Sequence, residues 1–122
     1  MLFPSLYQIQ SITNVETNKF EAQIILDAKH EIFNGHFPNN PVMPGVCMMQ
    51  IIKEITEQII GCQVRLIESN NIKFMALINP VVTPNLRLEF EIVAIENEIK
   101  VKNVTYFNDT VALKLSSLYS KN

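Results

Sequence analysis

The amino-acid sequence predicts an α+β fold in which one long helix packs against an antiparallel sheet. Residues 44–60 form the only stretch whose apolar side chains follow helical spacing over several turns. The segments on either side are shorter, are rich in β-branched and aromatic residues, and are separated by turn residues, as strands are. A helix and a sheet each bury an apolar face, so one helix and one long sheet are expected to cover each other in two layers.

Two strands are expected before the helix and three or four after it. The first two are joined by the polar stretch TNVETNK, which predicts a hairpin connection. Apolar and charged residues alternate through residues 86–92, and Ala94 continues the apolar face, which is the pattern of a half-buried strand. Turn residues at 97–98 and 108–109 predict an antiparallel meander at the C-terminal end. The expected strands are residues 6–12, 20–28, 71–78, 86–96, 99–107 and 110–120.

The predicted helix has clear signals at both ends. Pro44 suits the first turn, and Gly61 suits the left-handed position just past a helix end. Apolar side chains cover far more than the ~100° stripe of a surface helix, so a curved sheet is expected to wrap around it. The polar residues form one narrow strip, which lies either in solvent or in a functional site. This strip consists of Gln50, Lys53, Glu54, Glu57 and Gln58.

Length and composition predict a single domain spanning residues 1–122. Charged residues make up 18% of the chain, with 10 Lys and Arg against 12 Asp and Glu, so the composition indicates neither disorder nor a nucleic-acid partner. No segment approaches the ~18 apolar residues of a membrane span, and the N-terminal residues do not resemble a signal peptide. A cytoplasmic location is therefore expected. Cys47 and Cys62 lie near opposite ends of the helix, roughly 20 Å apart, and are expected to be reduced.

The stretch HFPNNPVMPGV, residues 36–46, is the most informative part of the sequence. Its three prolines fix the backbone φ angle, so the loop loses little entropy when it presents a side chain in one orientation. His36 titrates near neutral pH and is suited to proton transfer. The first helical amides, around Gly45 and Val46, lack intrahelical acceptors and stabilise negative charge developing on an oxygen. This combination favours chemistry next to a carbonyl group.

The same stretch resembles the HFPxxPxxPGV signature of the 3-hydroxyacyl-acyl-carrier-protein dehydratases. Asn34-Gly35 resembles the residues that precede the signature in that family, and NNIKFMALINPVVTPNLRLEFEI is similar to the strand-loop-strand segment that follows the helix. The resemblance extends over about residues 6–118. The residues that match the signature are His36, Phe37, Pro38, Pro41, Pro44, Gly45 and Val46.

The resemblance implies a hot-dog fold, a long antiparallel sheet wrapped around one central helix. It implies pairing into a homodimer with active sites at the subunit interface, and a trimer of dimers or a heterodimer with a related subunit are further possibilities. The substrate is expected to be carried on acyl carrier protein, within lipid metabolism such as fatty acid biosynthesis. No cofactor is expected, and two histidines with two distant cysteines do not supply the ligands of a zinc site.

Residue roles follow from the resemblance. In that family the histidine matching His36 is the acid/base that abstracts the α-proton of a (3R)-3-hydroxyacyl thioester, giving the trans-2-enoyl product. The amide matching Gly45 donates a hydrogen bond to the thioester carbonyl, and the residue matching Val42 orients the histidine through its backbone. Substrate contact is expected at Phe37, Val42, Gly45, Val46 and Met49. Candidates for an acyl tunnel, with core packing as an equal alternative, are Met43, Met48, Met49, Phe74 and Met75.

The match breaks at Gln50, where the family carries a carboxylate that helps the 3-hydroxyl leave as water. An amide can orient a hydroxyl or a water, but it has no proton to deliver at neutral pH. One turn later, where the family commonly has a glutamine, this chain has Glu54, and residues four apart on a helix share a face. One hypothesis is that Glu54 supplies the carboxylate beside Gln50. The alternative is that both belong to a solvated strip.

Two other functions remain open from the sequence. A hot-dog acyl thioesterase would hydrolyse the thioester instead, using an interface carboxylate to activate water. A non-catalytic acyl-binding protein or heterodimer subunit is favoured by Gln50. His30 is expected to be an exposed residue at the end of a strand, without a catalytic role.

Overall fold

The structure is a computed structural model, and it describes residues 5–34 and 41–122. Two strands, one long helix and four further strands follow one another, as the sequence predicts, with one additional short helix. The elements are β1 (Tyr7–Glu16), β2 (Lys19–Leu26), the 3-10 helix η1 (Glu31–Phe33), α1 (Gly45–Ile60), β3 (Val64–Phe74), β4 (Asn85–Ile95), β5 (Glu98–Phe107) and β6 (Thr110–Lys121).

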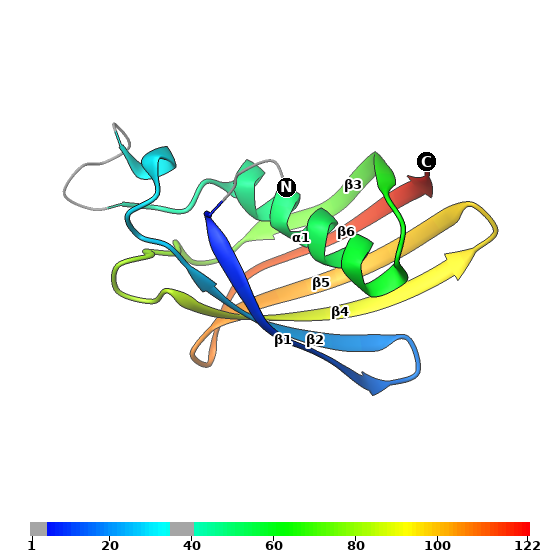
Figure 1. Cartoon of the computed structure of the whole chain (residues 1–122), viewed down its shortest axis with the longest axis horizontal. Helices are drawn as coiled ribbons and strands as arrows, with labels where there is room; N and C mark the ends of the chain where they lie inside the picture. The colour runs from blue at the N-terminus through cyan, green and yellow to red at the C-terminus, as the bar shows by residue number, and fades with distance from the viewer. Residues whose placement is uncertain (1–4, 35–40) are drawn as a thin grey trace.

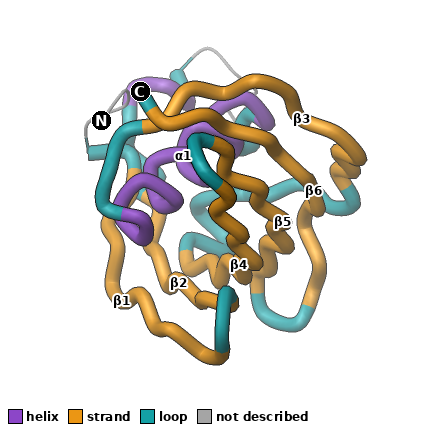
Figure 2. Tube along the Cα trace, turned by 90° about the vertical axis from the view of Figure 1, so that its right-hand side faces the viewer, coloured by secondary structure: helices purple, strands orange, loops and turns teal. Residues whose placement is uncertain are grey.

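The six strands form one antiparallel sheet in the order β1-β2-β4-β5-β6-β3. Figure 1 shows α1 lying across one face of this sheet. Figure 2 shows from the side that the sheet curves around the helix, with β1 and β3 as its two edge strands. The expected two-layer α+β arrangement, a long sheet wrapped around one helix, is therefore confirmed.

Both ends of α1 follow from the residues that flank it. Pro44 has an extended backbone and occupies the position just before the helix, while the φ angle of Gly61 is 79°, in the left-handed region that favours glycine. The Gly61 N–H donates to the carbonyl of Glu57 at 2.9 Å. The face of the helix that meets the sheet is fully buried. Its buried residues are Cys47, Met48, Ile51, Ile52, Ile55 and Thr56.

The polar strip of α1 is mostly covered rather than solvated. Only Gln58 is exposed. The half-buried members are Gln50, Lys53, Glu54 and Glu57. The N–H of Val64, the first residue of β3, donates to Oε2 of Glu57 at 2.9 Å, so one member of the strip fixes the point where β3 begins.

The strand after the helix differs from the sequence prediction. β3 begins at Val64 and ends at Phe74, so the predicted range 71–78 is wrong at both ends. The physical reason is that β3 is an edge strand whose side chains are exposed on both faces over most of its length. Residues 64–70 therefore lack the alternation of a half-buried strand. Register shifts interrupt the pairing of β3 with β6 twice, which adds local irregularity.

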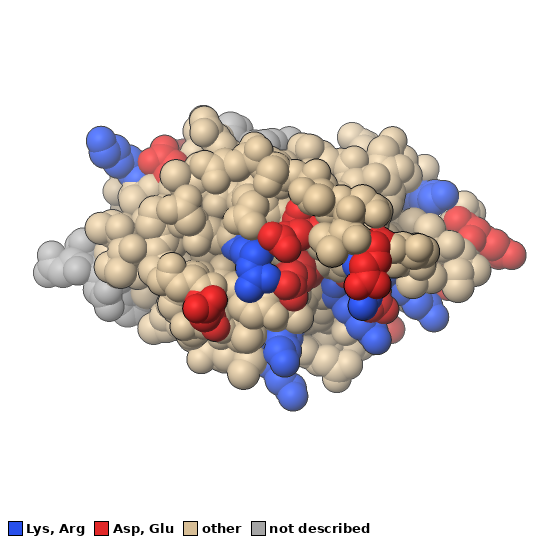
Figure 3. Space-filling view, turned by 90° about the horizontal axis from the view of Figure 1, so that it is seen from below, with Lys and Arg blue, Asp and Glu red and all other residues tan. Residues whose placement is uncertain are grey.

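The outer face of the sheet carries charges of both signs. Glu91 of β4 lies between Lys19 of β2 and Lys102 of β5 in the strand register, and Arg87 forms an ion pair with Glu89. Figure 3, which views the molecule from below, shows acidic and basic side chains next to one another. Such a face has neither the apolar surface for another layer nor the basic surface for nucleic acid. Within the described part of the chain, no helix is long and apolar enough to cross a membrane.

Candidate active site

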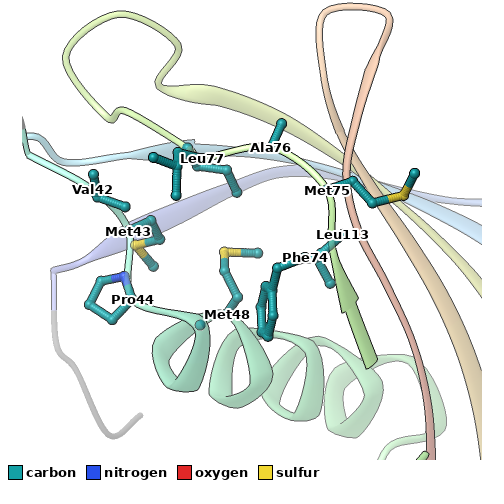
Figure 4. Close-up of a pocket in the computed structure, with 11 residues that line it drawn as sticks. Val42, Met43, Pro44, Met48, Phe74, Met75, Ala76, Leu77 and Leu113 are labelled. Atoms are coloured by element: carbon teal, nitrogen blue, oxygen red, sulfur yellow. The ribbon is translucent and has the colours of Figure 1, made fainter. Parts of the chain in front are cut away.

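An apolar cavity of about 450 Å³ lies at the N-terminal end of α1. Figure 4 shows Met43, Met48 and Phe74 pointing into the space between the start of the helix and the segment that follows β3. The N–H of Met43 donates to the carbonyl of Ile78 at 2.8 Å, which ties the chain entering α1 to the chain leaving β3. The cavity is lined by Val42, Met43, Pro44, Gly45, Met48, Phe74, Met75, Ala76, Leu77, Ile78 and Leu113.

The start of α1 leaves backbone donors beside this cavity. Pro44 makes no side-chain cap, and the first helical turn has no acidic residue. The Pro44 carbonyl accepts from the N–H groups of Cys47 and Met48, whereas those of Gly45 and Val46 find no acceptor among residues 5–34 and 41–122. With respect to the described part of the chain, the positive end of the helix dipole is therefore left for an oxygen atom of a ligand.

Gly45 is also required by the wall of the cavity. A Cβ added at position 45 would lie 2.6 Å from the Phe74 Cζ atom, so the ring occupies the space that a larger residue would need. Only glycine allows the aromatic ring to lie this close to the helix start.

A second cavity, of about 260 Å³, lies between α1 and the strands β3 and β6. Gln50 lines it from the helix, and Ser69, Ser117 and Tyr119 line it from the sheet. The Ser69 and Ser117 hydroxyl oxygens are 2.9 Å apart and share a hydrogen bond. Burial raises the pKa of Tyr119 to about 12, so its phenol keeps its proton at neutral pH. The polar groups of this cavity, called the polar cavity below, are an amide, the Lys53 ammonium group and several hydroxyl groups. Its apolar lining consists of Val46, Met49 and Leu66.

Gln50 belongs to a hydrogen-bond network that joins α1 to β1. The Gln50 Nε2 donates to Oε2 of Glu54 at 3.0 Å. The hydroxyl of Tyr7 donates to Oε1 of the same carboxylate at 2.7 Å. Gln50 and Glu54 are thus brought together, as their spacing predicts, and a tyrosine from the first strand joins them.

The predicted site residues divide among these features. Val42 and Gly45 line the apolar cavity, while Val46, Met49 and Gln50 line the polar one. Glu54 opens instead on a third cavity, which it shares with Tyr7. Of the tunnel candidates, four line the apolar cavity and Met49 does not. His36 and Phe37 lie outside the described residues.

The remaining candidate groups have structural contacts. His30 is half-buried and caps η1, where its Nδ1 accepts from the Ile32 N–H at 3.1 Å; the expectation of an exposed side chain is therefore wrong. Cys47 and Cys62 are both free thiols. Burial raises the pKa of the Cys47 thiol, which disfavours the thiolate form that a nucleophile needs.

Sequence reasoning did not find Tyr7, Ser69 or Ser117. A tyrosine in the first strand, whose polar tip needs a partner when buried, is the signal that indicates a partner in the polar strip of the helix. Ser69 carried no such signal because it lies in the part of β3 that the sequence pattern does not predict.

Comparison with solved structures assigns the fold. The chain superimposes on the dehydratase heterocomplex ApeI:P from Xenorhabdus doucetiae with a TM-score of 0.73 at 17% identity, covering 93% of this chain and 96% of that one. It also matches a putative thioesterase, a phenylacetic acid degradation-related protein from Ralstonia eutropha, with a TM-score of 0.67 at 12% identity, covering 93% and 83%. These similarities show that the fold is the hot-dog fold.

Sequence comparison gives the family. Residues 10–114 match the ApeI-like family model, described as ApeI dehydratase, and the chain belongs to this family. It is 31% identical to the 3-hydroxyacyl-acyl-carrier-protein dehydratase FabZ of Fusobacterium nucleatum, covering 93% of this chain and 86% of that protein. It is 26% identical to the FabZ of Lactococcus lactis, covering 88% and 77%.

Proposed function

We propose that this protein dehydrates a (3R)-3-hydroxyacyl thioester, carried on acyl carrier protein, to the trans-2-enoyl thioester. The observation that carries the proposal is the start of α1, which has no side-chain cap and whose Gly45, near the end of the histidine-proline signature, lines an apolar cavity. The FabZ relatives support it because their names give this reaction class and this carrier.

In this proposal the helix start binds the reacting carbonyl. The Gly45 N–H donates to the thioester oxygen and stabilises the negative charge that develops there when the α-proton leaves. His36 removes that proton, with its ring oriented by the backbone at Val42. The acyl chain occupies the apolar cavity beside Met43 and Met48, where burial of its methylene groups contributes binding free energy.

Gln50 and Glu54 take the place of the family carboxylate near the departing hydroxyl. Both are half-buried, and both belong to one hydrogen-bond network. A charged carboxylate next to a neutral amide supplies an acceptor and an orienting dipole at this end of the substrate.

We further propose that a second copy of the chain pairs along β3. This edge strand exposes apolar side chains, as does the first helical turn at Val46, and an unpaired edge of this kind is a template for strand addition. The exposed apolar residues of β3 include Leu66, Ile67, Ile72 and Phe74.

Gln50 favours one alternative, in which a related subunit supplies the missing carboxylate. The similar structure from Xenorhabdus doucetiae is named as a heterocomplex, which supports this possibility for the family. In that case the purified chain alone would be inactive and would gain activity on mixing with the related subunit.

The product of a purified reaction tests the proposed function. The protein is incubated with a 3-hydroxyacyl thioester on acyl carrier protein, and the products are separated by chromatography and identified by mass spectrometry. Enoyl thioester supports dehydration, whereas free fatty acid would indicate a thioesterase. Absence of both products with the chain alone would reject the homodimeric enzyme.

Replacing Gly45 by alanine should impair substrate binding more than stability. The new Cβ meets the end of the Phe74 ring, which is 58% exposed and can swing outward, so the cavity wall moves while the core does not. The gain of up to about 1 kcal/mol in helix propensity offsets part of the strain. We expect KM to rise roughly tenfold, a loss of about 1.4 kcal/mol of binding, with little change in melting temperature.

Gly61→Ala is the matched control for that substitution. No atom lies within 4 Å of the added Cβ, but the φ of +79° strains an alanine by about 1–2 kcal/mol. It should lower the melting temperature and leave KM unchanged. A wild-type KM for Gly45→Ala would contradict the role of this helix start.

A further inference from the structure

The Tyr7–Glu54–Gln50 network has a defined direction. A carboxylate only accepts hydrogen bonds, so the Gln50 group that faces Glu54 must be the NH₂ and not the carbonyl. The Tyr7 hydroxyl is likewise a donor to this carboxylate. The Gln50 carbonyl oxygen is consequently turned away from Glu54.

The cavities lie on different sides of this network. Gln50 lines the polar cavity beneath β3, and Glu54 does not. Glu54 lines a separate cavity with Tyr7, Glu57 and Cys62, and Gln50 does not. Seen from the polar cavity, Glu54 and Tyr7 therefore lie behind Gln50.

Burial makes the Tyr7 end of the network rigid. Tyr7 is 4% exposed and belongs to the hydrophobic core, so its ring is fixed by packing. Burial, and then the hydrogen bond to Glu54, raises the pKa of the Tyr7 phenol, which keeps the proton on the donor across the neutral range. A buried donor of this kind is costly to leave unpaired.

We propose that Tyr7 is a positioning residue, which acts through Glu54 to hold the Gln50 amide with its carbonyl oxygen toward the polar cavity. The inference rests on the proposed dehydration and assigns separate roles to Gln50 and Glu54 in it. The Gln50 oxygen accepts the hydrogen bond of the substrate 3-hydroxyl, and Glu54 fixes the amide from behind.

With Gln50 as an acceptor only, both proton transfers of the reaction are made by His36. His36 takes the α-proton from C2, the C2–C3 double bond forms, and the C3–O bond breaks. The leaving oxygen receives the proton from the His36 imidazolium and departs as water, which returns the histidine to its neutral form. Gln50 directs the hydroxyl toward that proton and donates none itself.

Kinetics of Tyr7→Phe test the proposal. Loss of the hydroxyl should lower kcat by roughly three- to tenfold, with KM changed by less than about twofold, since a group that orients the reacting hydroxyl acts mainly in the transition state. In a Gln50→Ala background the same substitution should have no further effect. An equal loss in both backgrounds would overturn the proposal.

Tyr106→Phe is the matched control. It removes one tyrosine hydroxyl that donates to a glutamate, Glu89, on β4, at 3.1 Å, in a pair that lines neither cavity at α1. It should leave kcat unchanged. Melting temperatures of both variants are measured, and the kinetics are recorded well below them, so that loss of folded protein does not imitate a lower kcat.

Glu54→Gln separates positioning from acid catalysis. As an anchor, Glu54 can be replaced by an amide that still accepts from Tyr7 while the hydrogen bond from Gln50 is lost, and kcat should fall about tenfold. Loss of a general acid costs roughly 10²–10⁴-fold. A loss of that size would overturn the assignment of Glu54 behind Gln50.

Nuclear magnetic resonance tests the network without turnover. The Gln50 side-chain NH₂ signals, assigned by their absence in Gln50→Ala, should shift in Tyr7→Phe and remain in place in Tyr106→Phe. Unmoved signals in Tyr7→Phe would overturn the linkage. A wild-type protein that does not dehydrate its substrate would reject the proposed function instead, and the resonance result would still decide whether Tyr7 holds Gln50.

Discussion

Replacing His36 by alanine is expected to lower kcat for dehydration by roughly 10²–10⁴-fold, the range for loss of a general acid/base. The proposed mechanism uses this histidine twice, as the base that removes the α-proton and as the acid that protonates the leaving oxygen, so its loss should lie toward the upper end. Binding of the acyl chain in the apolar cavity should persist. The measurement is steady-state kinetics on a 3-hydroxyacyl thioester, with product identified by mass spectrometry.

The second histidine of the chain provides the control. His30 caps η1 through its Nδ1 atom, and His30→Asn keeps a side-chain acceptor at that position. This variant should retain wild-type kcat and stability. Full activity in His36→Ala would show that His36 is not the acid/base. It would also contradict the residue roles taken from the resemblance to the dehydratase family.

Exchanging the acid and the amide is expected to raise activity. In the double variant Gln50→Glu with Glu54→Gln, the new amide at position 54 accepts from Tyr7 and donates to the new carboxylate at position 50. The network therefore survives, with the hydrogen bond between positions 50 and 54 reversed in direction. A carboxyl group then faces the polar cavity and can deliver a proton. We expect kcat to rise roughly ten- to hundredfold, within the range that a general acid contributes.

The pH profile gives a further signature of the exchange. A general acid must be protonated, so the double variant should lose its added activity as pH rises through the pKa of the new carboxyl group. Gln50→Glu alone places two carboxylates together, which raises one pKa of the pair and moves that loss to higher pH. A double variant slower than the wild type would show that position 50 does not need an acid.

The helix and its surroundings follow directly from the sequence because their signals are local. Pro44 and Gly61 mark the ends of α1, and the excess of apolar residues between them predicts a helix wrapped by a sheet. The first half of β3, residues 64–70, was not predicted because an edge strand is not required to bury one face. The order of apolar and polar residues in β3 therefore does not follow the alternation of a strand that packs one face on the core.

The candidate site is predictable only as far as its residues lie near one another in the chain. The helix start and the Gln50–Glu54 pair depend on neighbours within one or two turns. Tyr7 bonds Glu54 across 47 residues, and only the folded sheet brings β1 against the side of α1. The identity of the residue behind Gln50 is therefore a property of the tertiary structure.

The mixed charges on the outer face of the sheet limit how this protein can assemble. Because that face does not favour stacking, copies that associate through β3 would extend the sheet sideways. If each site is completed only by such pairing, the specific activity will depend on protein concentration. On dilution below the dissociation constant for pairing, the copies would separate while each chain remains folded. Each site would then lack the residues supplied by the second copy, and activity would fall before any spectroscopic sign of unfolding.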